Sequence, residues 1–173
     1  MIDVDKEIEK IPLTREKYAL VDALDYVFLM QWKWHYDDGY AKRTAFTSKG
    51  PRAVFMHKIV FGSPDWQQVD HIDQNTLNNC KSNLRNATHR ENMINRKKRP
   101  GCTSIYKGVS WCKPISKWKA AIGNYGKKIC LGFFVFEEDA ASAYNKAAKM
   151  YHKEFACLNV LNPSERKKYG EVK

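Results

Sequence analysis

The side chains best suited to chemistry in this sequence lie in a short, polar and Asn-rich segment, residues 61–96. Asp70 and His71 are neighbours there, and Asn83 and Asn92 follow them along the chain. Carboxylate and amide oxygens are hard ligands that suit Mg²⁺ or Mn²⁺, which keep several water molecules when proteins bind them. A neutral imidazole can take a proton from water near neutral pH. Together these groups predict metal-assisted attack of water on a phosphodiester.

Local signals indicate the elements that would bring these groups together. Thr88 and Glu91 have the spacing of a capping box, so we expect a helix that starts at Thr88. Asn92 and Asn95 are three residues apart and therefore project to the same side of that helix. The Asp-His pair would end a strand, and the loop that contains Asn83 would return the chain towards it. The arrangement predicts an Asp and an amide around one point, with an imidazole beside them.

A purely structural interpretation of the same residues stays open at this level. An isolated Asp-His pair is commonly a turn residue beside a hydrogen-bonded histidine, and runs of Asn are common in loops. The residues alone therefore do not decide between a catalytic site and a polar loop.

The net charge favours a polyanionic partner. The chain of 173 residues has 30 Lys and Arg against 19 Asp and Glu, a formal net charge of +11. Most of this excess lies in residues 101–173, which contain 13 basic and 6 acidic side chains. Lys and Arg release condensed counterions when they neutralise phosphates, which indicates nucleic acid. A basic surface that serves solubility alone is the alternative.

Composition also excludes several classes of protein. No apolar run approaches the roughly 20 residues that a membrane-spanning helix needs. The N-terminal residues are charged and lack the apolar stretch of a secretion signal. The five cysteines are odd in number and form no Cys-x-x-Cys pair, which argues against a disulfide framework and a Cys-rich zinc site. We therefore expect a cytoplasmic protein with a packed core, since 43% of the residues are hydrophobic.

The pattern of short strands and helices predicts an α+β protein with two domains. Residues 18–60 read as short antiparallel strands, with turns at Asp37-Asp38-Gly39 and Ser48-Lys49-Gly50-Pro51. The strands expected there are residues 18–22, 28–36, 40–48 and 52–60. A basic run ends at Pro100-Gly101, the predicted domain boundary. Beyond it we expect a three-stranded antiparallel sheet packed on one helix. The elements expected in this second domain are strands near 104–112, 117–124 and 127–135 and a helix over 137–152.

Five segments around the Asp-His pair share residue types and spacing with a known nuclease module. They are Met56-His57-Lys58-Ile59-Val60, Val69-Asp70-His71-Ile72-Asp73, Asn78-Asn79, Ser82-Asn83-Leu84-Arg85 and Glu91-Asn92-Met93-Ile94-Asn95. Through them, residues 57–96 resemble the HNH module (His-Me finger) of homing endonucleases from phages and mobile introns. The resemblance implies a ββα-metal finger within residues 1–100, preceded by the short strands, and a divalent-metal-dependent DNA endonuclease.

The same resemblance implies a role for each candidate residue. His71 corresponds to the general base and Asp70 to a metal ligand. Asn83 stands where the family has the residue that orients the base or supports the scissile phosphate. Asn92 matches a second metal ligand, a position that many relatives fill with His, so a zinc site is disfavoured further. The implied cofactor is Mg²⁺ or Mn²⁺, and His57 is expected to be structural.

Segments of the C-terminal part match a second family. They are Tyr106-Lys107-Gly108-Val109-Ser110, Lys117-Trp118-Lys119-Ala120-Ala121-Ile122, Leu131-Gly132-Phe133-Phe134, the helix of residues 137–148, and Leu158-Asn159-Val160. Through them, residues 104–160 resemble the plant Apetala/ethylene-response-factor domain, which also occurs beside HNH nucleases in phages and mobile elements. That family lays its three-stranded sheet in the major groove of duplex DNA. The resemblance implies that residues 101–173 bind double-stranded DNA.

The resemblance also points to individual contact residues. Lys107 and Lys128 occupy contact positions of the family, and Trp118 lies on the contacting strand. Lys117 and Lys119 are further candidates for phosphate contacts. An interpretation of Trp118 as a core aromatic stays open.

Three contact positions depart from the plant pattern. Ser110, Cys112 and Gly123 stand where the plant proteins usually have Arg. Because Arg is the side chain that reads guanine with two hydrogen bonds, the plant target sequence does not transfer to this chain.

Two functions from different classes follow. The first is a site-specific DNA endonuclease whose finger nicks or cuts while the C-terminal domain supplies position. The second is a non-cleaving DNA-binding regulator derived from such a nuclease. The complete set of Asp70, His71, Asn83 and Asn92 favours the endonuclease. An RNA binder or ribonuclease is a third interpretation, because phosphate contacts do not identify the sugar.

Further expectations concern the assembly and its setting. A monomer has a single active site, which predicts nicking of one strand. The cytoplasm of a bacterial or phage-infected cell is the expected location.

Overall fold

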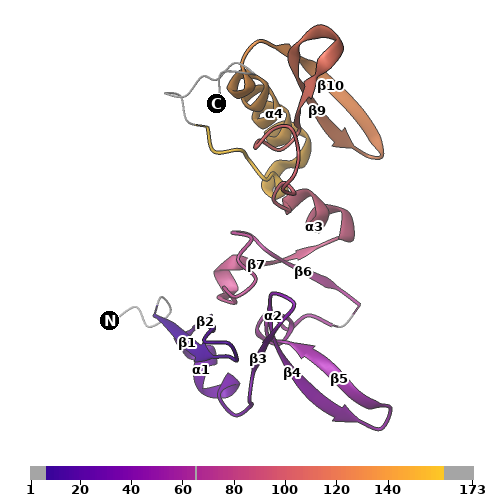
Figure 1. Ribbon diagram of the computed structural model, residues 1–173. Helices are drawn as coiled ribbons and strands as arrows, with labels where there is room; N and C mark the ends of the chain where they lie inside the picture. The colour runs from indigo at the N-terminus through magenta and orange to yellow at the C-terminus, as the bar shows by residue number, and fades with distance from the viewer. Residues whose placement is uncertain (1–6, 65, 162–173) are drawn as a thin grey trace, which may run out of the picture. The chain divides into compact units, whose positions relative to one another are not determined.

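The computed structural model describes residues 7–64 and 66–161, which form the mixed helices and antiparallel strands of an α+β protein (Figure 1). The predicted fold class is therefore confirmed. The charged residues 1–6 and the end of the predicted C-terminal domain, residues 162–173, lie outside the described residues. The chain divides into two compact units that meet between Asn92 and Met93, and each unit has a hydrophobic core of its own.

The first unit begins with two small antiparallel sheets. Strands β1 (Ile8–Pro12) and β2 (Tyr18–Asp22) pair as a hairpin, and the short helix α1 (Ala23–Leu29) follows. The second sheet has its strands in chain order: β3 (His35–Asp37), β4 (Tyr40–Thr47) and β5 (Gly50–Phe55). Helix α2 (Met56–Phe61) comes directly after β5. The side chains at the centre of this unit are Ile11, Val21, Leu29 and Met56, none more than 1% exposed.

The strand expected over residues 28–36 is wrong, because its first part belongs to α1. The helix ends at Leu29, where the indole Nε1 of Trp34 donates a hydrogen bond of 2.8 Å to the carbonyl of Leu29. Trp34 is also buried in the core of the first unit, so the helix ends beside a packed tryptophan where apolar content alone favoured an extended strand.

The strand expected over residues 52–60 is also interrupted. It ends at Phe55, and α2 then buries Met56, His57 and Val60. This spacing of buried side chains is that of one face of a helix, whereas a strand would alternate its faces.

The polar segment folds into a hairpin of β6 (Gln68–His71) and β7 (Leu84–Ala87), followed by helix α3 (His89–Asn95). The Asp-His pair ends β6, as predicted. Val69 of β6 and Leu84 of β7 belong to the core of the first unit, so apolar burial anchors the hairpin.

The start of α3 confirms the predicted capping box. The backbone N–H of Glu91 donates to Oγ1 of Thr88 at 3.2 Å, and the backbone N–H of Thr88 donates to Oε2 of Glu91 at 2.8 Å. The hydrogen bonds from Thr88 keep the pKa of Glu91 below its usual value. Together they fix the first turn of the helix that carries Asn92.

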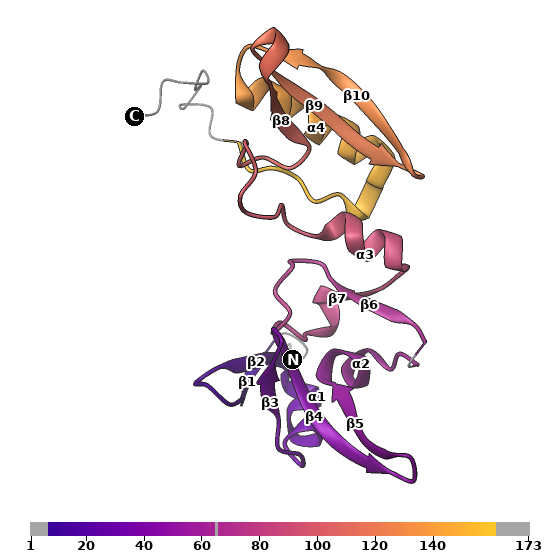
Figure 2. The same cartoon turned by 45° about the vertical axis from the view of Figure 1, so that its right-hand side comes forward.

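The second unit is a three-stranded antiparallel sheet with helix α4 (Glu137–His152) along one face (Figure 2). The sheet order is β10-β9-β8, and the strands are β8 (Val109–Cys112), β9 (Lys117–Asn124) and β10 (Lys127–Phe134). The buried side chains of α4 include Ala140, Tyr144, Ala147 and Ala148, which lie on the face of the helix that packs on the sheet, as the sequence predicts for this helix. The strand expected over 104–112 is shorter, since turns occupy the residues before Val109.

Gly108 shows how closely α4 approaches the sheet. It has a φ of +75°, and a Cβ built on it would lie 2.0 Å from the ring of Tyr144. Only glycine satisfies both the backbone conformation and the contact.

Within residues 7–64 and 66–161, no helix combines the length and the apolar character needed to cross a bilayer.

Candidate active site

Asp70 lies in a buried ion pair at the end of β6. It faces Arg85 of β7 in the ladder, and Oδ2 of Asp70 accepts from Nε of Arg85 at 2.9 Å and from Nη2 at 2.7 Å. Asp70 is 4% exposed. Because removing a charge from water is costly unless the charge is paired, the guanidinium of Arg85 supplies the counter-charge for this buried carboxylate.

His71 is the next residue and points to the other face of the hairpin, since successive side chains of a strand alternate. Its Nε2 is 3.2 Å from Oδ1 of Asn79, and its ring centre is 5.1 Å from that of His57. Burial lowers the pKa of His71 below the ordinary 6.5. The imidazole is therefore neutral at neutral pH, the form that a general base requires.

The partner of His71 also selects its tautomer. The side-chain Nδ2 of Asn79 donates to the carbonyl of Leu77 at 3.3 Å, so Oδ1 is the atom turned towards His71. An amide oxygen only accepts, which assigns the imidazole proton to Nε2 and the lone pair to Nδ1. Nδ1 is then the ring nitrogen that can accept a proton.

His57, at the start of α2, is a packed neutral imidazole. Its ring contacts those of Phe55 and Tyr40, at centroid distances of 5.3 and 5.6 Å. Burial lowers the pKa of His57 to about 3. This environment fits the structural role expected for His57, with its ring fixing one side of His71.

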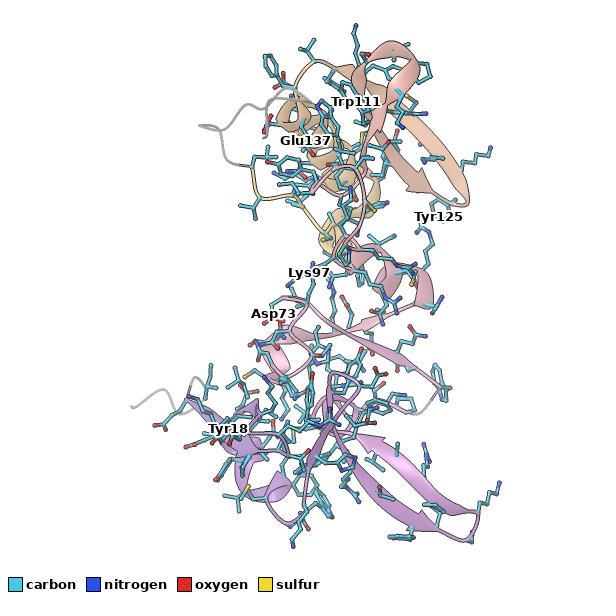
Figure 3. All side chains as sticks on the ribbon, in the orientation of Figure 1. Tyr18, Asp73, Lys97, Trp111, Tyr125 and Glu137 are labelled. Carbon is cyan, nitrogen blue, oxygen red and sulfur yellow. The ribbon has the colours of Figure 1, made fainter. Side chains whose placement is uncertain are left out.

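Asn83 clamps the loop that joins β6 to β7. Its Oδ1 accepts from the backbone N–H of Asp73 at 3.0 Å, and its Nδ2 donates to Oδ1 of Asp73 at 2.9 Å and to the carbonyl of Asn78 at 2.8 Å. Asp73 is labelled at this loop in Figure 3. The structure thus gives Asn83 a part in shaping the loop after His71, whereas the amide bonded to the His71 ring is that of Asn79.

Asn92 lies on the side of the hairpin to which Asp70 points. The Nδ2 of Asn92 is 3.4 Å from Oε1 of Gln68, which shares a strand face with Asp70 because the two are separated by one residue. Gln68 is also 3.4 Å from Nδ1 of His89, so this glutamine links β6 to two side chains of α3. The expected proximity of Asp70 and Asn92 rests on this shared face.

The donor set suits one kind of metal. One carboxylate and one amide oxygen are hard donors, and Mg²⁺ and Mn²⁺ bind in this way, with water and substrate phosphate as further ligands. Zinc prefers Cys and His in sets of three or four. Among residues 7–64 and 66–161 no group of three or more His, Cys, Asp or Glu side chains could hold a metal. The residues therefore fit Mg²⁺ or Mn²⁺ only together with oxygens from outside the protein.

The predicted DNA contacts of the second unit divide between two locations. Lys119 pairs with Ser110 of β8 and Phe133 of β10, on the face of the sheet opposite the buried Trp118 and Ala120. The predicted contact residues Lys117 and Lys128 follow the same alternation and are exposed; they and Lys119 make this open face basic.

The other two predicted contacts, Trp118 and Lys107, make contacts within the protein. Trp118 is 3% exposed and belongs to the core under α4, because β9 turns it towards the helix. The Nζ of Lys107 donates to the carbonyls of Ile94 and Arg96 at the end of α3, and burial lowers the pKa of Lys107. An ammonium that satisfies helix carbonyls is engaged within the protein. Trp118 and Lys107 therefore have structural tasks here.

Two functional candidates have no role in the sequence interpretation, Asn79 and Arg85. Each is identified by its partner, since Asn79 contacts His71 and Arg85 is paired with Asp70. The register of the hairpin could have suggested Arg85, because an antiparallel ladder that places Leu84 opposite His71 also places Arg85 opposite Asp70.

Comparison with known proteins shows similarity to nucleases. Residues 56–94 match a family model described as HNH endonuclease. An uncharacterised HNH endonuclease of Acanthamoeba polyphaga mimivirus is 38% identical over 149 residues, which cover 84% of this chain and 76% of that protein. Protein 3.8 of Escherichia phage T7 is 40% identical over 65 residues, which cover 38% of this chain. That match spans 54%, about half, of the length of the T7 protein.

Proposed function

Because this chain belongs to the HNH endonuclease family, we propose that it hydrolyses phosphodiester bonds of duplex DNA with a divalent metal ion and His71 as the general base. The observation that carries the proposal is the presence of two suitable side chains, Asp70 and His71, at the end of β6. A neutral, buried imidazole comes directly after a carboxylate that is paired with Arg85 and turned to the face that also receives Asn92.

In this proposal β6, β7 and α3 form a ββα-metal finger. His71 takes a proton from water at Nδ1 while the water oxygen bonds to phosphorus. The bond from phosphorus to the leaving sugar oxygen breaks, and that oxygen is protonated from solvent. Asp70 and Asn92 would hold Mg²⁺ or Mn²⁺, which stabilises negative charge on the phosphate and on the leaving oxygen. Asn79 holds the imidazole in its reactive tautomer, and Asn83 holds the loop that follows it.

We assign duplex binding to the open face of the β8-β9-β10 sheet, as in the Apetala/ethylene-response-factor domain that residues 104–160 resemble. Lys117, Lys119 and Lys128 supply the positive charge there, and α4 covers the other face. Residues that position the protein on DNA are then separate from those that cut it, which is the arrangement of a site-specific, homing-type nuclease. A monomer with one such site nicks a single strand.

The function is tested with supercoiled plasmid DNA. With Mg²⁺ or Mn²⁺ the protein should convert it to the relaxed circle, because one cut strand releases the supercoils, and EDTA should stop the reaction. Gel electrophoresis of the products, with sequencing of the cut ends, is the measurement. A protein that shifts the plasmid in a gel but leaves it supercoiled at every metal concentration would be the non-cleaving DNA-binding regulator instead.

The open sheet face gives a second prediction. Lys119→Gln and Lys128→Gln should each weaken binding to duplex DNA and reduce the log–log salt slope by about 1, the change expected when one phosphate contact is lost. The measurement is fluorescence anisotropy of a labelled duplex over a range of salt concentrations.

Lys149→Gln is the matched control for these two variants. Lys149 is exposed on α4, which packs on the other face of the sheet, so the same change of charge there should leave the slope unchanged. Equal slopes for all three variants would contradict the assignment of the binding face.

A further inference from the structure

The ion pair between Asp70 and Arg85 lies where the proposed metal would bind. The side chains of Asp70 and Arg85 are 5% and 16% exposed, and the hydrogen bonds from Nε and Nη2 of Arg85 end on the same oxygen, Oδ2 of Asp70. Arg85 lies opposite Asp70 in the ladder, so the backbone of β7 holds the guanidinium beside the carboxylate. This is a preorganised contact between two backbone-anchored groups.

The pair balances the charge of the metal ligands before any metal arrives. Asp70 supplies one negative charge, Asn92 supplies none, and Arg85 adds one positive charge beside the carboxylate. A divalent cation that approaches the DNA-free protein therefore finds a ligand carboxylate whose single negative charge is offset by Arg85, and a guanidinium that repels the cation. The affinity of the DNA-free protein for the divalent metal should therefore be low.

A phosphate of DNA changes both the charge at the site and the affinity for the metal. It adds negative charge and oxygen ligands for the metal, and it is a natural partner for a guanidinium, which binds phosphate through two parallel hydrogen bonds. Arg85 can then exchange part of its bonding from Oδ2 of Asp70 to the phosphate, which frees carboxylate oxygen for the cation.

We propose that Arg85 makes the binding of divalent metal at Asp70 depend on bound DNA. The inference rests on the proposed function, since it takes Asp70 as a metal ligand. Arg85 acts through Asp70 and is a positioning residue of the site. The protein then binds little metal until a DNA phosphate is present, so the site is not occupied by metal in the absence of DNA.

Metal binding and DNA binding are thermodynamically linked, which sets the size of the effect that the proposal predicts. If DNA raises the affinity for the metal by some factor, the metal raises the affinity for DNA by the same factor. Coupling between two binding sites is typically about 5- to 150-fold, and we expect at least about tenfold here.

The test measures Mn²⁺ affinity from the electron paramagnetic resonance signal of the free ion, so it does not depend on cleavage. Full-length protein with His71→Ala keeps the DNA intact, and a titration of the duplex alone corrects for Mn²⁺ bound by DNA. The duplex should tighten Mn²⁺ binding by at least about tenfold. Arg85→Gln, which keeps an N–H donor for Asp70 but removes the charge, should tighten binding in the DNA-free protein by a similar factor and shrink the effect of DNA.

Two control variants separate charge from structure. Arg85→Lys keeps the positive charge and should keep the weak DNA-free affinity. Lys81→Gln removes an ion pair of 2.8 Å with Asp25 in the same unit, and should leave Mn²⁺ affinity unchanged. If Arg85→Gln fails to fold, as seen by circular dichroism, Arg85→Met is the second variant that removes the charge, and it should tighten Mn²⁺ binding in the DNA-free protein in the same way.

Equal Mn²⁺ affinity with and without duplex would overturn the inference, and so would Arg85→Gln binding Mn²⁺ no more tightly than the parent. Either result leaves the proposed nuclease standing if the plasmid is nicked. Failure to bind Mn²⁺ in every state, together with an unnicked plasmid, would remove the proposed function as well.

Discussion

His71→Ala should reduce plasmid nicking by roughly 10²- to 10⁴-fold, the range by which general bases accelerate reactions, while the affinity for duplex DNA stays the same. The expected size of the loss follows from the environment of His71. The ring is buried and bonded through Nε2 to Asn79, so Nδ1 is the atom that would receive the proton in the proposed reaction. The measurement is the initial rate of nicking, with anisotropy of a labelled duplex for binding.

The pH profile gives an independent check on the same residue. Burial lowers the pKa of His71, so the neutral base persists below the ordinary pKa of 6.5. Nicking should therefore be fully active above that value and fall as the pH drops through the lowered pKa, with a midpoint below 6.5.

His35→Ala is the matched control, because it removes another imidazole of the first unit, from strand β3. It should leave the rate and its pH profile unchanged. A His71→Ala protein that nicks at the parental rate would sink the assignment of the base.

Asp70→Asn should cost at least about 10²-fold in nicking at low metal concentration. Loss of a group that only supports a metal ligand typically costs 10- to 100-fold, and loss of the ligand itself should cost at least as much. Raised Mn²⁺ should restore part of the rate, because the change weakens metal binding and leaves the base in place. The measurement is the nicking rate over a titration of Mn²⁺.

The same substitution also affects stability, and the two effects can be separated. Asp70→Asn removes the carboxylate that is ion-paired with Arg85, which should cost on the order of 3 kcal/mol. Combining it with Arg85→Gln should restore the melting temperature without restoring activity. Asn92→Ala breaks no ion pair, so it should lower activity at an unchanged melting temperature. Parental Mn²⁺ dependence in both Asp70→Asn and Asn92→Ala would contradict the proposed ligands.

The elements predicted well from the sequence are those specified by short-range signals. The capping box of Thr88 and Glu91 starts α3, and the alanine-rich face of α4 packs on the sheet, as their spacing predicts. Strands β9 and β10 have ends that agree closely with the expected ones, because the turn at Asn124-Tyr125-Gly126 separates them. In each case the signal that predicts the element is a pattern of residue types within a few positions along the chain.

The errors occur where tertiary burial decides. Helices α1 and α2 have seven and six residues, too few to be stable alone, and packing around Leu29 and Met56 holds them. The faces of β9 are a second case. Trp118 and Lys119 are neighbours in sequence, and only the helix on one side of the sheet makes the first a core residue and leaves the second on the open face.

The sequence by itself determined which residue types stand at the HNH spacing: Asp70, His71, Asn83 and Asn92 are read directly from the chain. Only the tertiary structure decided what surrounds them. Asn79 at the ring of His71 and Arg85 on the carboxylate of Asp70 depend on the register of the hairpin and on the course of its loop. The physical reason is one of range. Residue type and spacing are local properties, whereas the partner of a buried charge, and with it the affinity for metal, is set by groups that folding brings within about 3 Å.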